Sequence, residues 1–423
     1  MTNIILSPEN TYLLPFEEGT WKLSLATLDA HSEHRRPTSI YLYVGRRIIS
    51  YQNEILTLGV TVERDGEEEK VYLKVLRTHL QVSCSMDTTS TYLSYHAYHC
   101  LERMMSYDQS ADFEKYYWPD FFNQKTWRSK FLTIINDRMG LDISLKSNYN
   151  RFYKPGEFLL QDLQAQNLPL NYKELPREVP QLVLDDEVLS FFVTKRFQLF
   201  KQYTSLPFLL GYEGRLKKDK SAVKQYRTLI TDNVEVANLL NPSQAQLMGY
   251  VREMLPLDNK AFNIVNGSAP SSWPEEVRRL FDTWHKAWPL VCIQPFLKCY
   301  LLGRTENYKI KPYRHWIQNI QPSLLVPQLC IICNMRNDYL EISLCLKVHG
   351  KLHHIAYADY LFFVQDEHCN FYLLGSLQDV ALVQWFKAYG FCLSVLKCHY
   401  EEELLVFLNQ LEAVYEVRYK KKL

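Results

Sequence analysis

The stretch Ile55-Leu-Thr-Leu-Gly-Val-Thr-Val62 is rich in β-branched residues and alternates along its length, and Val71-Tyr-Leu-Lys-Val-Leu76 does the same. Between them lies Glu63-Arg-Asp-Gly-Glu-Glu-Glu-Lys70, a polar segment with one glycine. Two alternating runs joined by such a turn are typical of an antiparallel β-hairpin. A third run, Ile40-Tyr-Leu-Tyr-Val44, precedes the pair. We therefore predict an antiparallel sheet near the N-terminus.

Immediately after this sheet, Val82-Ser-Cys-Ser-Met86 and Leu93-Ser-Tyr-His-Ala-Tyr-His-Cys100 have the layout of a small zinc module. In such a module a strand with Cys-x-Cys precedes a helix that opens with Cys-x-His, which together make a tetrahedral site. Here a thioether and a hydroxyl replace two of the thiolates, and neither is a usual zinc ligand. We therefore expect a degenerate finger with no metal or other cofactor. The four ligand places are held by Cys84, Met86, Ser94 and His96.

This layout resembles the SWIM zinc finger found in the region before the motor of bacterial SWI/SNF-type ATPases. Phe121-Phe-Asn-Gln-Lys-Thr-Trp-Arg-Ser-Lys-Phe131 matches the Phe-Phe and basic helix that follows the finger in that family. The strand-rich segments from Tyr339-Leu-Glu-Ile-Ser-Leu-Cys-Leu346 to Leu411-Glu-Ala-Val-Tyr-Glu-Val-Arg-Tyr419 resemble the part just before the motor. The resemblance implies a pre-motor module that works beside a separately encoded SWI/SNF-type ATPase. The two missing ligands are its main departure from the family.

The composition indicates a folded protein with no global electrostatic field. In 423 residues, 48 Lys and Arg balance 47 Asp and Glu, so contact with nucleic acid would need a local basic patch. Met1 to Pro15 lacks the pattern of a signal peptide, and no apolar run is long enough to span a bilayer. The ten cysteines mostly have apolar neighbours, as in proteins of a reducing compartment. We therefore expect a cytoplasmic protein that does not contact a membrane.

The pattern along the chain predicts an α+β protein with three domains. The β-rich first domain covers 1–160, and a proline-containing connector covers 161–188. We predict a helical domain over 189–322, because Val188 to Gln202 and Ser221 to Leu239 read as helices, as do two segments with clear start signals. Those segments begin at Asn241-Pro242 and at Trp273-Pro-Glu-Glu276. A return to alternating strands followed by two helices predicts an α+β domain over 323–423.

No enzyme active site is visible in the sequence. A phosphate-binding loop of the Gly-x4-Gly-Lys-Ser/Thr type is missing, and Leu182-Val-Leu-Asp-Asp-Glu187 reads as a solvated helix start. Cys330-Ile-Ile-Cys333 has the spacing of a metal knuckle, yet its apolar interior favours a buried strand. The pair His353-His354 has no adjacent carboxylate or cysteine and is weak evidence for a metal site.

Local basic patches are the remaining candidates for a binding site. One lies around Tyr226, one combines cations with His315 and Trp316, and a third is the tail Lys420-Lys-Lys422. Cations interleaved with aromatic residues are typical of surfaces that track phosphates. The residues predicted to bind nucleic acid are Lys217, Lys218, Lys220, Lys224, Arg227, Lys309, Lys311 and Arg314.

The sequence thus favours a non-catalytic accessory module that binds protein or nucleic acid. Two alternatives stay open: a bacterial effector or defence enzyme of unrecognised fold, and a structural subunit of a larger assembly. Convergence of polar groups in one deep pocket would favour the enzyme, and a large apolar surface would favour the subunit.

Overall fold

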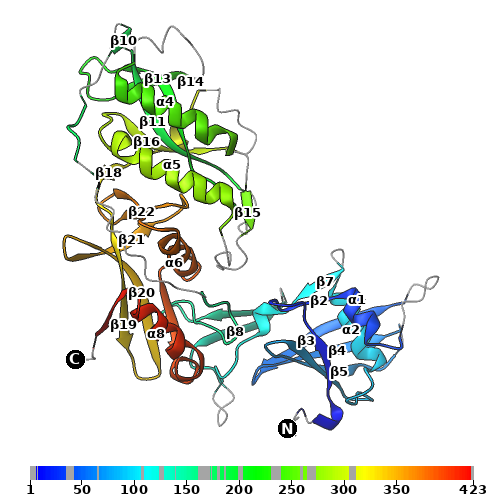
Figure 1. Cartoon of the computed structure of the whole chain (residues 1–423). Helices are drawn as coiled ribbons and strands as arrows, with labels where there is room; N and C mark the ends of the chain where they lie inside the picture. Colours follow the sequence, from blue (N-terminus) through cyan, green and yellow to red (C-terminus); the bar gives the residue numbers. More distant parts are fainter. Residues whose placement is uncertain are drawn as a thin grey trace. The chain divides into compact units, whose positions relative to one another are not determined.

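The chain forms two compact units, Met1–Glu157 and Phe158–Leu423, in a computed structural model (Figure 1). Each unit is strand-rich, with a few helices, so the α+β class predicted from the sequence is confirmed. The predicted domain boundary at 322/323 lies inside the second unit and stays a prediction. The structure describes residues 6, 8–34, 42–63, 66–105, 109–122, 128–138, 140–160, 172, 174–178, 182–184, 187–198, 203–229, 240–257, 261–263, 273–303 and 311–420.

A five-stranded antiparallel sheet is the centre of the first unit, in the order β1-β6-β5-β4-β3. The predicted hairpin is confirmed, since Leu56 faces Leu73 and most apolar residues of both strands are buried. Burial of one face explains the alternation in the sequence, because successive side chains of a strand point to opposite faces. The strands are β1 (Tyr12–Pro15), β3 (Val44–Gln52), β4 (Ile55–Val62), β5 (Glu69–Val75) and β6 (His79–Cys84).

Helix α2 (Tyr95–Met104) packs on this sheet through a buried face that includes Ala97, Cys100 and Leu101. Ser94, which is fully buried, caps the helix by accepting a hydrogen bond from the Ala97 amide at 3.1 Å. Met86, by contrast, is 63% exposed. The two residues that replace thiolates, Met86 and Ser94, therefore lie in different environments, one in contact with solvent and one in the core. The strand and helix of the predicted finger are present, but a finger-like element is not confirmed.

The rest of the first unit consists of short elements. The basic helix that begins at Phe121 was expected to reach Met139; this is wrong over 128–138, because Leu132–Asp137 forms a strand that pairs antiparallel with Gly140–Leu145. Gly140 has a φ of +118°, which favours glycine at the turn. The elements are η1 (Pro8–Asn10), β2 (Lys22–Ser24), α1 (Leu25–Ala30), β7 (Ser110–Asp112), η2 (Glu114–Tyr116), β8 (Leu132–Asp137) and β9 (Gly140–Leu145).

The second unit begins with a mixed sheet in the order β14-β13-β11-β16-β17, with β10 paired to β11. Strand β11 pairs antiparallel with β13 and parallel with β16, and its residues Val188 to Val193 are all buried. A continuous apolar run suits a strand buried on both faces as well as it suits a buried helix. The strands are β10 (Leu182–Leu184), β11 (Glu187–Arg196), β13 (Phe208–Leu216), β14 (Val223–Leu229), β16 (Leu297–Leu302) and β17 (Ile317–Asn319).

These strands correct the prediction of a helical middle domain. The expected helices over 188–202 and 221–239 are wrong where the structure describes them, because β11 and β14 occupy these stretches. The two segments with start signals are helices, since Asn241 caps one and Pro274 precedes two acidic residues in the other. The remaining elements here are β12 (Tyr203–Ser205), α4 (Pro242–Met254), η3 (Leu255–Leu257), β15 (Ala261–Asn263), α5 (Glu275–Cys292) and η4 (Arg314–Trp316).

The two faces of this sheet are covered in different ways. Helix α4 packs beside α5 and against β13, where Met248 lies over Gly211. On the other face the aromatic ring of Phe192 lies 4.9 Å from that of Tyr226 and 6.0 Å from that of Tyr300. Tyr226 lies on β14 near one edge of the sheet and Tyr300 on β16 near the other, so the sheet curls around Phe192.

A larger sheet ends the second unit, in the order β18-β23-β22-β21-β20-β19-β25, with β24 paired to β20. The Cys330-x-x-Cys333 segment lies in β19, as predicted, and both thiols are buried. The elements are β18 (Gln321–Ser323), β19 (Gln328–Met335), β20 (Tyr339–Val348), β21 (Lys351–Tyr357), β22 (Phe363–Asp366), β23 (Asn370–Leu373), α6 (Leu377–Lys387), β24 (Cys392–Leu396), α7 (Lys397–His399), the π-helical turn η5 (Tyr400–Leu404), α8 (Leu405–Glu412) and β25 (Glu416–Lys420).

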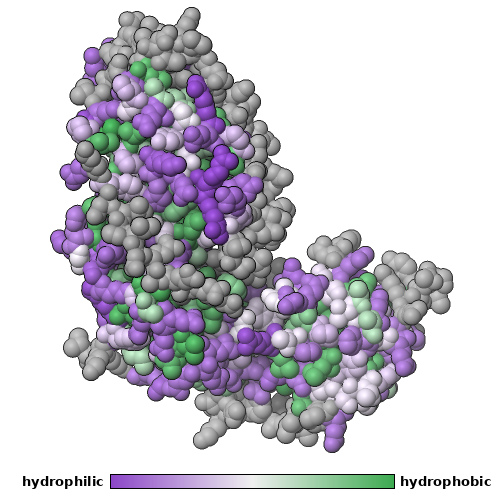
Figure 2. Space-filling view, viewed as in Figure 1, coloured by the Kyte–Doolittle hydropathy of each residue, from purple (hydrophilic) through white to green (hydrophobic). Residues whose placement is uncertain are grey.

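The long helix α5 is amphipathic rather than apolar throughout. Helix α5 buries Trp284 and Trp288 and exposes Arg278 and Asp282. On the face shown in Figure 2, hydrophilic residues cover much of α4 and α5. Among the described helices, none has the length and apolar character needed to cross a membrane.

Two lysines share one carboxylate inside the second unit. The Lys195 ammonium on β11 donates a 2.8 Å hydrogen bond to the Asp359 carbonyl and lies 4.0 Å from the Asp359 carboxylate. Lys387 lies closer to that carboxylate, at 2.7 Å. Burial therefore outweighs the attraction to Asp359 and lowers the pKa of Lys195 to about 8.

We predict that Ser94→Ala will lower the free energy of unfolding of the first unit by about 1 kcal/mol, because it removes the cap of α2. Denaturant unfolding followed by circular dichroism would measure the change. Ser94→Thr is the matched control, because it keeps a capping hydroxyl and should lower the free energy of unfolding less than Ser94→Ala. Ser94→Asp is less suitable, because it would bury a charge. Equal stability of the alanine variant and the native chain would contradict a capping role.

We also predict that Lys195 makes stability depend on pH in the alkaline range. The pKa of Lys195 is about 8 in the folded chain against an ordinary value of 10.5, so the unfolded chain binds more protons between these values. The contribution of Lys195 to the free energy of unfolding should therefore rise as the pH rises from 8 to 10.5, by on the order of 3 kcal/mol, and be lost as the pH falls back to 8.

Urea unfolding of Lys195→Met across this pH range should show a smaller rise in stability than the native chain. Lys397→Met is a suitable control, because Lys397 is exposed and should leave the rise unchanged. The same rise in Lys195→Met and in the native chain would show that Lys195 does not titrate in this range.

Candidate functional site

Three of the predicted lysines lie in the turn between β13 and β14. The turn is held by hydrogen bonds from the Lys217 amide to the Ala222 carbonyl and from the Lys220 amide to the Lys217 carbonyl, both 2.9 Å. The side chains of Lys217, Lys218 and Lys220 are exposed. The backbone bonds therefore present three cations on one ordered turn.

One carboxylate accompanies these lysines. Asp219 accepts hydrogen bonds from the amide and the hydroxyl of Ser221, at 3.1 and 2.8 Å. The hydrogen bond from the Ser221 hydroxyl has the larger effect and that from the Ser221 amide the smaller, and both lower the pKa of Asp219. The carboxylate therefore stays ionised at neutral pH. Its charge offsets only part of that of the three lysines.

The second predicted patch lies on η4 and the residues before it. Tyr313 is 48% exposed and Trp316 37% exposed, although large aromatic side chains are usually buried. The imidazole of His315 lies between them, with ring centroids 5.8 Å from Tyr313 and 5.0 Å from Trp316. Arg314 and Lys311 are exposed beside these rings. This segment thus presents cations and aromatic faces together.

The structure brings the two patches together. The guanidinium of Arg314 donates a 2.7 Å hydrogen bond from Nη2 to the backbone carbonyl of Lys224 on β14. Lys224 lies four residues after Lys220, near the start of the strand that follows the turn. We call the combined region the basic–aromatic surface. It consists of Lys217, Lys218, Lys220, Lys224, Lys311, Tyr313, Arg314 and Trp316.

The surface as defined leaves out two of the predicted residues. The Arg227 guanidinium pairs with Glu187, so its charge is already offset. Glu187 also hydrogen-bonds Glu213, and this contact, with desolvation, raises the pKa of Glu213 to about 7. Lys309 lies outside the described residues.

The cysteine and histidine motifs of the sequence do not form shared sites. Cys330 and Cys333 are three positions apart on β19, so their side chains point to opposite faces of the sheet. Burial raises the pKa of Cys333 to about 12. In the first unit, burial raises the pKa of Cys100 to about 12, so this thiol is protonated at neutral pH. The Asp185-Asp186 pair lies outside the described residues.

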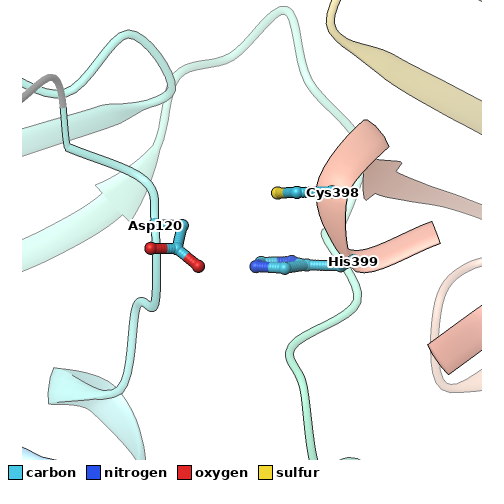
Figure 3. Close-up of side chains that lie close together, drawn as sticks. All are labelled: Asp120, Cys398 and His399. Atoms are coloured by element: carbon cyan, nitrogen blue, oxygen red, sulfur yellow. The ribbon is translucent and has the colours of Figure 1, made fainter. Parts of the chain in front are cut away.

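Two side-chain clusters were not expected from the sequence. Cys398 and His399 stand side by side on α7, with the thiol exposed and the imidazole buried (Figure 3). Asp120, also drawn in Figure 3, belongs to the first unit and is not part of this pair. The second cluster brings His353 next to Glu367 and His368. The only signal for it in the sequence was the His353-His354 pair, whose carboxylate partner is supplied by the turn between β22 and β23.

Comparison with known proteins adds no relative from which a function could be transferred. No family model, no curated protein and no solved structure matches the chain. The resemblance to the SWIM-type pre-motor region therefore stays a hypothesis, and the geometry of the chain is the basis for a functional proposal.

Proposed function

We propose that this protein is a non-catalytic accessory module that binds nucleic acid through the basic–aromatic surface. The observation that carries the proposal is the hydrogen bond from Arg314 to the Lys224 carbonyl, which joins two basic segments that are far apart in the sequence. Cations from both segments then form one continuous region, whereas the chain as a whole has a net charge of only +1. Such a region attracts phosphates by local electrostatics and the release of counterions.

The exposed rings favour single-stranded nucleic acid over duplex. Unpaired bases expose their faces and stack on aromatic side chains, whereas bases in a duplex are already stacked on one another. Tyr313 and Trp316 offer such faces next to Arg314, which would hold a neighbouring phosphate. The proposed ligand is therefore single-stranded DNA or RNA, bound with little dependence on sequence.

The accessory role rests on the sequence and on the resemblance. The chain contains no phosphate-binding loop, so it lacks the residues of a nucleotide-driven motor. A separately encoded SWI/SNF-type ATPase is the partner that the resemblance implies. In that arrangement the basic–aromatic surface would hold a strand while the partner supplies the motor.

We predict that Lys217→Gln, Lys218→Gln and Lys220→Gln combined will weaken binding and reduce its dependence on salt. Each lost phosphate contact changes the slope of log affinity against log salt by about 0.7 on single strands and about 0.9 on duplex. The triple variant should therefore flatten the slope by about 2 to 3 units. Fluorescence anisotropy with a labelled homopolymeric oligonucleotide at several salt concentrations would measure it.

A matched control for this variant combines Lys286→Gln, Lys351→Gln and Lys397→Gln. These three lysines are exposed on α5, β21 and α7, away from the basic–aromatic surface. The control removes the same charge and should keep the native slope. An equal reduction of the salt slope in both triple variants would show that the attraction does not depend on the basic–aromatic surface. If the native chain binds no oligonucleotide at low salt, the protein-binding role is favoured instead.

We further predict that Trp316→Ala will weaken binding of single strands by roughly 1 to 3 kcal/mol and of duplex by less, because stacking on the indole is lost. Trp316→Phe keeps an aromatic face and should retain most of the affinity. The same anisotropy assay with single-stranded and duplex oligonucleotides would compare them. An equal effect of both substitutions on both ligands would exclude a stacking role for Trp316.

A further inference from the structure

A cluster of metal-binding side chains lies where β21 meets the turn between β22 and β23. His353 is on β21, and Glu367 and His368 are in the turn. One ligand atom of each residue lies within 4.8 Å of those of the other two. The pairing of the strands explains this contact, because Ile355 faces Asp366 in an antiparallel register. Continuing that register by two residues brings position 368 opposite position 353.

Asp366 holds the turn in a fixed conformation. Its carboxylate is buried and accepts hydrogen bonds from the backbone amides of His368 and Asn370, both 2.9 Å. It also accepts hydrogen bonds from the Asn370 amide group at 2.9 Å and from the Tyr372 hydroxyl at 3.0 Å. Glu367 and His368 therefore extend from a rigid support, as the ligands of metal sites do.

His353 contributes a buried nitrogen that points into the cluster. Its Nδ1 is shielded from solvent and has no hydrogen-bond partner. The nearest acidic oxygens are Glu367 Oε1 at 3.4 Å and Asp366 Oδ2 at 4.0 Å. A buried polar atom without a partner lowers stability, so such atoms are uncommon unless another group satisfies them. A cation between Nδ1 and Glu367 would satisfy this atom.

We propose that His353, Glu367 and His368 bind a zinc ion. Two imidazoles and one carboxylate are a donor set that zinc favours over magnesium or calcium, which prefer oxygen ligands. The cluster contains no thiolate among its three ligands, which sets it apart from the finger-like segment. Asp366 is not counted among the ligands, because its own oxygens accept the hydrogen bonds of the turn.

Two of the three distances between ligand atoms are close to those around a zinc ion. Tetrahedral ligands about 2.0 to 2.1 Å from zinc lie about 3.3 to 3.4 Å from one another. His353 Nδ1 and Glu367 Oε1 are 3.4 Å apart, and His368 Nε2 and Glu367 Oε1 are 3.8 Å apart. The side chain of His368 is 65% exposed and free to move by a few tenths of an ångström.

Three protein ligands leave the fourth position of a tetrahedral ion for water or another ligand. The bound ion would also connect β21 to the turn after β22, which are separate in sequence. Zinc should therefore stabilise the folded second unit as its concentration rises, since it binds the folded arrangement and not the unfolded chain.

The test uses the full chain, treated with a chelator and then titrated with zinc in competition with a chromophoric indicator. We expect one zinc per chain, bound at least roughly tenfold more weakly after His353→Ala, Glu367→Gln or His368→Ala. His354→Ala is the matched control, because His354 is the next residue on β21 and points to the opposite face. It should bind zinc as the native chain does.

A thermal unfolding measurement with and without zinc accompanies the titration. Zinc should raise the melting temperature of the native chain and of His354→Ala, and should do so much less for Glu367→Gln and His368→Ala. Both of these replace exposed side chains, so they should fold normally. Absence of zinc from the native chain would overturn the proposal. Zinc that survives all three cluster variants but is lost with Cys84→Ala would also overturn it, in favour of the finger-like segment.

Discussion

Burial of β11 on both faces is the constraint from which the arrangement of the second unit follows. The side chains from Val188 to Val193 are inaccessible to solvent, and each buried aliphatic or aromatic side chain contributes roughly 1.5 to 3 kcal/mol. Helices α4 and α5 pack over one face. On the other face the sheet curls, with Tyr226 and Tyr300 closing over Phe192.

The curl has a direct consequence for the surface. It brings β14, near one edge of the sheet, within reach of η4, which leads into the strand at the other edge. Arg314 then donates its hydrogen bond to the Lys224 carbonyl, and two basic segments become one region. The attraction for phosphates that we propose would thus be local, in a chain that is almost neutral overall, and Arg227, which pairs with Glu187, would add little to it.

The parts of the fold that the sequence predicted are those with strong local signals. The polar turn between Ile55 and Val71 predicted the hairpin, and the Asn241 cap and the proline before Glu275 predicted two helices. The described parts of the segments 188–202 and 221–239 were mistaken for helices. The run of apolar residues in the first shows no alternation, because a strand buried on both faces has none, so periodicity could not separate it from a helix.

The candidate sites show the same division between local and tertiary information. The sequence by itself determined which cations and aromatic rings are available, the α+β class, and the absence of a phosphate-binding loop. Only the tertiary structure decided that Lys224 and Arg314 are neighbours and that His353 has a carboxylate partner in Glu367. Both contacts join separate elements, η4 with β14 and β21 with the turn after β22, and their proximity depends on strand order and register. Those are set by how the apolar faces pack, which no local spacing of residues records.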